Sequence, residues 1–141
     1  MDFAIGFMES FVEQACTPGA VPEQIVVNAF DALSEKAPSL SEAMIRSPQD
    51  FWHLWCSWWP IVTSSPESSA QFRACIHAIW SLGDAMRELD PQTTQTLFVE
   101  AGLPQVVDVI KKSPGKRDAL CDLIYAFVTC CESGASNRTV V

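Results

Sequence analysis

Prolines divide this chain into short segments, each of which has room for one helix. Proline has no backbone N–H and a fixed φ, so it is tolerated in the first turn of a helix but disrupts the interior. The nine prolines stand where an apolar helical pattern begins or has just ended. The pattern predicts about eight helices, over residues 2–16, 23–36, 39–46, 48–59, 66–89, 91–101, 104–112 and 116–132.

Local signals at the segment boundaries support this division. Ser47, Pro48 and Asp50 form a start signal, with serine at the N-cap, proline at the first helical position and an acid in the first turn. We expect Pro60 to kink or end the fourth helix and Gly102 to end the sixth. No run of β-branched residues alternates apolar and polar positions, so no strand is predicted. The predicted fold class is all-α, with short connections that favour antiparallel neighbours.

A chain of 141 residues is long enough for one domain with its own core. We expect residues 1–132 to form a single helical domain and residues 133–141 to form a flexible polar tail. Six cysteines mostly lie inside apolar, helix-periodic runs, where a free thiol behaves as a small buried side chain. With no signal peptide and no long apolar span, we expect a reducing compartment, cytoplasm or nucleus, and no membrane partner.

The charge is strongly acidic, with a formal net charge of −8. Nucleic-acid binders need a basic surface that neutralises phosphates, so nucleic acid is not an expected partner. The one basic cluster is Lys111, Lys112, Lys116 and Arg117. These four cations surround a Pro-Gly turn, and we expect them to be solvated.

The sequence offers no constellation for catalysis. The two histidines, His53 and His77, lie mid-helix among apolar residues, where a packed or edge position is expected. No His or Cys pair has metal-ligand spacing, and no glycine-rich loop is present to hold a phosphate. We therefore predict no enzyme activity, no metal and no cofactor.

Residues 71–134 resemble an armadillo or HEAT repeat. Residues 74–84 (ACIHAIWSLGD) are similar to a third armadillo helix, residues 97–110 to the turn into the next repeat, and residues 119–127 to its third helix. Ile79 and Ile124 are 45 residues apart, within the roughly 40–47 residues of such repeats. The resemblance implies a stack of helix pairs; a compact helical bundle is the alternative.

The resemblance also implies a peptide-binding groove. In armadillo proteins of the importin-alpha type, a Trp and an Asn four residues later line the inner groove. Trp80 matches the Trp, Asp84 replaces the Asn, and Tyr125 occupies the next Trp position. An acid there would favour a basic peptide, so the leading prediction is a scaffold or adaptor that binds a basic or helical peptide of another protein.

A tryptophan-rich segment suggests an alternative role. Four of the five tryptophans fall within residues 52–59. On a helix Trp52, Trp55 and Trp59 share one face, which either belongs to the core or carries exposed rings that anchor a partner. The alternative function is therefore self-association of a structural bundle through this face. Separately, Thr139-Val140-Val141 fits the C-terminal pattern that PDZ domains read, although a chance match is favoured.

Overall fold

The computed structural model describes residues 22–128, so the predicted helix over 2–16 and the predicted tail over 133–141 lie outside the described residues. Within that range the chain is all-helical, as predicted, and contains no strand. The α-helices are α2 (Glu23–Glu35), α3 (Ala37–Arg46), α4 (Pro48–Ser64), α5 (Ala70–Leu89), α6 (Pro91–Leu97), α7 (Leu103–Lys112) and α8 (Arg117–Val128). A short 3₁₀ turn, η2 (Pro114–Lys116), precedes α8.

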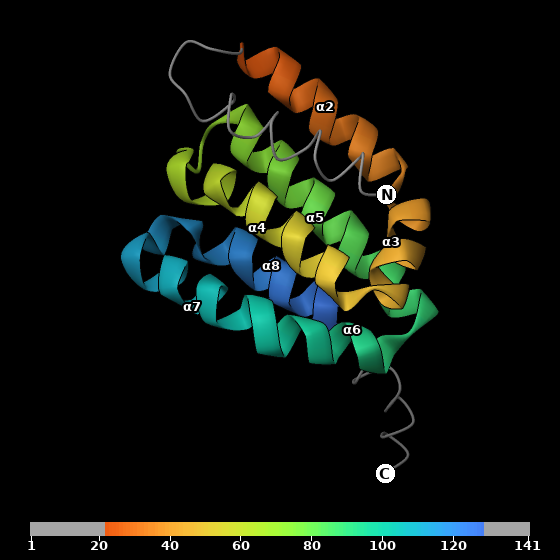
Figure 1. Cartoon of the computed structure of the whole chain (residues 1–141). Coiled ribbons are helices and arrows are strands. Elements are labelled where there is room, and N and C mark those ends of the chain that lie inside the picture. The colour runs from red at the N-terminus through yellow and green to blue at the C-terminus, as the bar shows by residue number, and fades with distance from the viewer. Residues whose placement is uncertain (1–21, 129–141) are drawn as a thin grey trace, which may run out of the picture.

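Helix α5 lies at the centre of the described structure. It contacts α2, α3, α4, α6 and α8, and Figure 1 shows α2 on one side of it and α8 with α6 and α7 on the other. A helix in this position has to be apolar on several sides. Its buried residues are Phe72, Ala74, Cys75, Ile76, Ala78, Ile79, Leu82, Gly83 and Met86.

The predicted helix end at Gly102 is wrong. Helices α6 and α7 are joined by a π-helical turn, η1 (Phe98–Gly102), and the backbone at Gly102 stays in the right-handed helical region. A Cβ at this position would lie 2.9 Å from Cζ2 of Trp55, so glycine allows the helix to approach that ring closely. With α6, η1 and α7 counted as one, residues 22–128 form six helices, and the predicted total of about eight is not confirmed.

The predicted end of the fourth helix at residue 59 is also wrong. Pro60 lies inside α4, and the helix continues for another turn to Ser64. Proline removes one helical hydrogen bond. The residues that follow it, Ile61 and Val62, are fully buried, and this burial favours continuation of the helix into the core.

The end of α4 is held by a buried lysine. The Nζ of Lys116 donates a hydrogen bond to the carbonyl of Val62 at 2.8 Å and a longer one to the carbonyl of Thr63 at 3.4 Å. Carbonyls in the last turn of a helix lack intrahelical partners, so a lysine there acts as a cap. Lys116 is only 6% exposed, so the prediction that all four residues of the basic cluster are solvated is wrong for this one.

The interior contains a cluster of aromatic rings, here called the aromatic core. Phe98 stacks on Phe127 with ring centroids 4.7 Å apart, and Trp55 stacks on Trp59 at 4.8 Å. Trp55 also meets both phenylalanines edge to face, and Phe51 contacts Trp55 and Phe127. The aromatic core therefore joins α4, η1 and α8.

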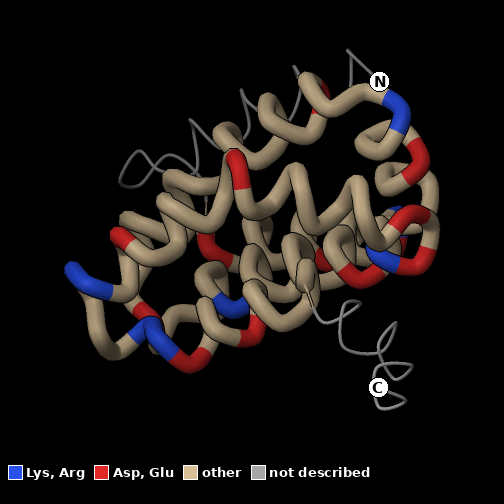
Figure 2. The backbone as a smooth tube through the Cα atoms, turned by 90° about the horizontal axis from the view of Figure 1, so that it is seen from below, with Lys and Arg blue, Asp and Glu red and all other residues tan. Residues whose placement is uncertain are grey.

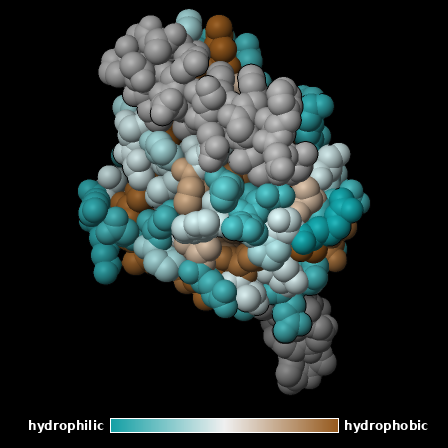
Figure 3. Space-filling view, in the orientation of Figure 1, coloured by the Kyte–Doolittle hydropathy of each residue, from teal (hydrophilic) through white to brown (hydrophobic). Residues whose placement is uncertain are grey.

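The surface of the described helices carries no continuous basic stripe. In Figure 2 the Lys and Arg positions are few and stand among acidic and uncharged ones. On the face seen in Figure 3, apolar residues form small, separate patches. The large apolar side chains that remain exposed are Ile25, Trp52, Trp80, Leu89, Val99, Val107 and Tyr125. Among the helices of residues 22–128, none is both long and apolar enough to cross a membrane.

Candidate functional site

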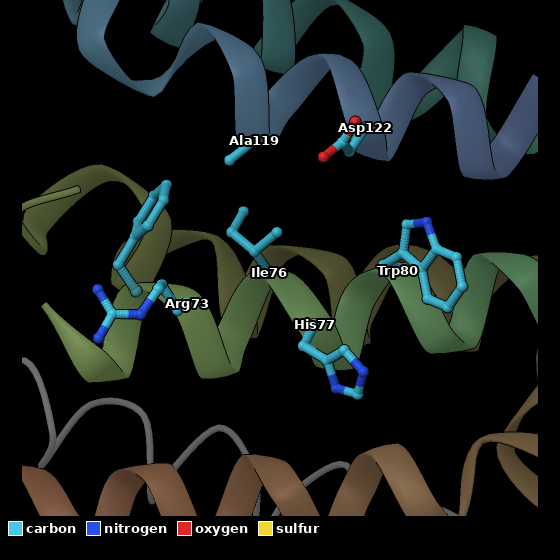
Figure 4. A pocket seen from close by; sticks show the side chains of 7 residues that line it. Arg73, Ile76, His77, Trp80, Ala119 and Asp122 are labelled. Atoms are coloured by element: carbon cyan, nitrogen blue, oxygen red, sulfur yellow. The ribbon is translucent and has the colours of Figure 1, made fainter. Parts of the chain in front are cut away.

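A groove between α5 and α8, here called the α5–α8 groove, is the strongest candidate site in the described part of the chain. Its volume is about 500 Å³. Figure 4 shows α5 along one side and α8 along the other. The lining residues are Phe72, Arg73, Ile76, His77 and Trp80 from α5, and Ala119 and Asp122 from α8.

Helical spacing explains why these residues meet. Phe72, Ile76 and Trp80 are four residues apart, so they follow one another along a single face of α5. On the opposite wall Ala119 has the smallest side chain that still has a Cβ. A small residue facing a row of large ones leaves space between two packed helices, and this space is the α5–α8 groove.

The α5–α8 groove has an apolar floor and a partly exposed aromatic ring. Phe72 and Ile76 are buried at 2% and 8% exposure, whereas Trp80 is 38% exposed. A concave, mostly apolar surface with a few polar groups at its rim is typical of binding sites. The half-exposed indole of Trp80 presents apolar area that a ligand can cover.

His77 forms the rim that faces α2. Its Nδ1 lies 3.2 Å from the hydroxyl of Ser34 on α2, and its ring stacks against Trp80 with centroids 6.2 Å apart and planes inclined by 16°. The stacking and the hydrogen bond restrict the two rings to one arrangement. His77 and His53 are both exposed, so of the two expected positions, packed or edge, neither histidine is packed in the core.

One cation and one carboxylate stand at the rim. Arg73 is exposed, and its Nη1 donates a hydrogen bond to the carbonyl of Ser68 at 2.7 Å. Within residues 22–128 no carboxylate pairs with this guanidinium. Asp122 lies across the groove on α8 and is exposed as well. An unpaired guanidinium at the rim is available to a ligand carboxylate.

The predicted groove residues are only partly brought together. Trp80 lines the α5–α8 groove. Asp84 does not, and its carboxylate is already paired with Arg87 one turn along the same helix. Tyr125 lies on α8 three residues beyond Asp122 and is 62% exposed, but it is not part of the lining.

The tryptophan-rich segment mostly belongs to the core. Trp55 and Trp59 are buried at 3% and 8% exposure, so the predicted face shared with Trp52 is not a surface. Trp55 is held by its stacking on Trp59 and by a hydrogen bond of 2.7 Å from its indole N–H to Oε1 of Gln105. Trp52 alone of these three rings is half-exposed, at 38%.

Several residues of the α5–α8 groove were not singled out from the sequence. Phe72, Ile76 and Ala119 carry no site prediction, and the spacing of Phe72, Ile76 and Trp80 is the signal that could have marked these three as one row. Asp122 carried no signal, because its role depends on how α8 packs against α5. Thr139-Val140-Val141 lies outside the described residues.

Comparison with family models, with curated proteins and with solved structures finds no match. The armadillo or HEAT resemblance therefore stays a prediction. In one respect the structure departs from it, because a helix break was expected near Gly102 and the chain is helical there. In the described part of the chain, no group of three or more His, Cys, Asp or Glu side chains could hold a metal ion.

Proposed function

We propose that this chain is a non-enzymatic protein-interaction domain that binds an amphipathic helix of a partner protein in the α5–α8 groove. The observation that carries the proposal is the apolar row Phe72, Ile76 and Trp80 facing the short side chain of Ala119. Helix-in-groove recognition uses a surface of this kind, in which apolar anchors of the ligand helix enter an apolar channel between two receptor helices.

The length of the groove suits such a ligand. Phe72 and Trp80 are eight residues apart on α5, which corresponds to about 12 Å along the helix axis. This is room for roughly two turns of a ligand helix, and two turns present two or three apolar side chains on one face. Trp80 would be the main anchor, since tryptophan is enriched among residues that dominate binding energy.

On the α5 side of the groove the charge of Arg73 favours a partner helix with an acidic residue beside its apolar stripe, whereas Asp122 on the α8 side disfavours an acid there. Arg73 has no carboxylate partner within residues 22–128, so it can pair with a Glu or Asp of the ligand. The prediction of a basic ligand depended on Asp84, whose carboxylate pairs with Arg87 outside the groove lining. We therefore propose a helical ligand with an acidic residue toward Arg73, in place of the predicted basic ligand.

A displayed library of 16-residue peptides tests the proposal. The full chain serves as bait, and enriched peptides are synthesised and measured by fluorescence anisotropy. We expect enriched sequences with apolar residues at helical spacing next to acidic residues. Trp80→Ala should weaken their binding about tenfold or more, as expected for loss of a hot-spot residue.

Trp52→Ala is the matched control, because Trp52 and Trp80 are each 38% exposed but only Trp80 lines the α5–α8 groove. The control should leave peptide binding unchanged. Equal losses in the two variants, or no enrichment above background, would contradict the proposal. Selective loss in Trp52→Ala would instead place the peptide-binding site on α4, at the exposed ring of Trp52.

A further inference from the structure

The segment that precedes the described residues has the pattern of a strongly amphipathic helix. Residues 2–16 carry apolar side chains at helical spacing, and their acids fall on the opposite side. At 100° per residue, Phe7 and Phe11 lie near the middle of the apolar side, and Glu9 and Glu13 lie across from it. The residues of the apolar side are Phe3, Ala4, Phe7, Met8, Phe11, Val12 and Ala15.

This segment joins the fold beside the α5–α8 groove. A carboxylate oxygen of Glu23, the first residue of α2, accepts a hydrogen bond of 3.2 Å from the backbone N–H of Gln71. The next residue along α5 is Phe72, which lines one end of the groove. The chain therefore reaches the described structure within a few residues of the apolar floor.

The intervening chain is long enough for the segment to turn back along α5. Residues 17–21 contain Pro18 and Gly19, which favour a turn, and five extended residues span up to about 17 Å. A helix over residues 2–16 would be about 22 Å long, more than the roughly 12 Å between Phe72 and Trp80. It can therefore cover the whole row while running antiparallel to α5.

The charges of the segment do not contribute a direct contact with the α5–α8 groove. Residues 1–21 contain Asp2, Glu9 and Glu13 and no Lys or Arg. Arg73 stands exposed at the rim of the α5–α8 groove without a carboxylate partner within residues 22–128. On a helix whose apolar side faces the floor, Glu9 and Glu13 point away from it, so their carboxylates do not pair with Arg73. The docking therefore depends on the apolar row and on where the chain joins the fold, and not on an ion pair.

We propose that residues 2–16 dock as a helix in the α5–α8 groove and must leave it before a partner helix binds. Docking of the segment stands on the observations above, whereas its competition with a partner rests on the proposed function. The segment then regulates access, because the affinity for a partner is reduced by the fraction of molecules in which the groove is occupied.

Photo-crosslinking in the full chain tests the docking. The photoreactive amino acid p-benzoylphenylalanine replaces Phe7 in one variant, and Glu13, on the opposite side of the predicted helix, in a matched control. At low protein concentration we expect the variant at position 7 to crosslink within one chain. The products, mapped by mass spectrometry, should join residue 7 to the peptides that contain residues 72–80 or 119–122.

Two results would overturn the docking. One is crosslinking of position 7 to another surface, or equal crosslinking to the groove from positions 7 and 13. The other is crosslinking between two chains, which would make a second copy the occupant. Either result concerns the segment alone and leaves the binding test with Trp80→Ala unaffected.

The competition is measured with the helical peptides enriched by the full chain. Phe7→Asp combined with Phe11→Asp should strengthen peptide binding, by about tenfold if the groove is occupied in nine molecules of ten. The control Glu13→Gln should have a smaller effect, because it removes one charge and keeps the apolar side. Crosslinking to the groove without any gain in affinity would show that the segment docks but does not compete.

Discussion

Helix α8 packs beside two pairs of stacked aromatic rings, one fully buried and the other partly exposed. At its C-terminal end Phe127 stacks on Phe98 in the aromatic core, and both rings are fully buried. Near its N-terminal end Ala119 faces the α5–α8 groove, where Trp80 stacks on His77 and remains 38% exposed. Stacked rings are therefore not by themselves a sign of core or of surface. The two sites differ in how closely α5 and α8 approach each other.

A glycine and an alanine lie at the two ends of the contact between α5 and α8. Gly83 of α5 faces Phe127, and a Cβ there would lie 2.7 Å from the phenylalanine ring, so the pair is packed without space. Ala119 faces the row of large side chains on α5 and leaves a groove of about 500 Å³. The two helices are therefore in close contact at Gly83 and leave a groove at Ala119.

The largest loss of stability is expected at Phe127, in the aromatic core. Phe127→Ala should lower the free energy of unfolding by about 3–5 kcal/mol, because it removes a fully buried ring and leaves a cavity. Urea denaturation followed by circular dichroism measures the loss. Tyr125→Ala is the matched control on the same helix, since Tyr125 is 62% exposed, and it should change the free energy of unfolding by about 0.5 kcal/mol or less. Equal effects would show that α8 is not oriented as described.

The helical class and several helix starts could be predicted because they depend on local signals, although α5 begins at Ala70 and not at the predicted residue 66. Proline and apolar periodicity act within a few residues, so starts such as Pro48 and Pro91 are confirmed, although the side chain of Ser47 makes no capping hydrogen bond. Gly102 and Pro60 misled the prediction for a shared reason. Each is a helix breaker by intrinsic preference, yet each lies within a helix whose neighbouring residues are buried in the core.

The candidate site could be predicted only at Trp80. Periodicity places Trp80 on a face of α5, but it does not say which helix lies opposite. The same limit applies to the tryptophans of α4. Trp52, Trp55 and Trp59 share a helical face by spacing, but Trp55 is buried against Phe98 and Phe127, Trp59 is buried and stacks on Trp55, and Trp52 remains partly exposed. Partner choice among helices is a tertiary property that a single sequence pattern does not contain.

A smaller loss of stability is expected at Lys116, which connects the end of α4 with the floor of the α5–α8 groove. The Nζ of Lys116 caps α4 and lies 5.2 Å from the ring centroid of Phe72, whose side chain forms part of the groove floor. Lys116→Met keeps the length of the side chain and removes the donor. It should cost about 1–3 kcal/mol of unfolding free energy, because helix-end carbonyls lose a charged hydrogen-bond donor. Lys112→Met, which removes only an exposed pair with Asp108, is the control.

Lys116 should also make the free energy of unfolding depend on pH. Burial lowers the pKa of Lys116 below 10.5, its ordinary value, while the nearby carboxylate of Glu67 opposes the shift. The folded protein therefore releases this proton at a lower pH than the unfolded chain does. Between the lowered pKa and about 10.5, the wild-type protein should gain stability relative to Lys116→Met as the pH rises. A difference that stays constant across this range would contradict the burial of the ammonium group.

The smallest loss of stability is expected at Trp80, whose ring is partly exposed. Trp80→Ala removes a ring that is 38% exposed and stacks only on His77 among the described aromatic residues, so it should cost about 1 kcal/mol or less. Urea denaturation measures this loss beside Trp58→Ala, which removes a ring that is 1% exposed and should cost about 3–5 kcal/mol. The contrast decides how a binding defect is interpreted. If Trp80→Ala weakens peptide binding about tenfold while the fold loses so little, the loss belongs to the α5–α8 groove. If it unfolds the chain as Trp58→Ala does, Trp80 is a core residue and the groove has no anchor.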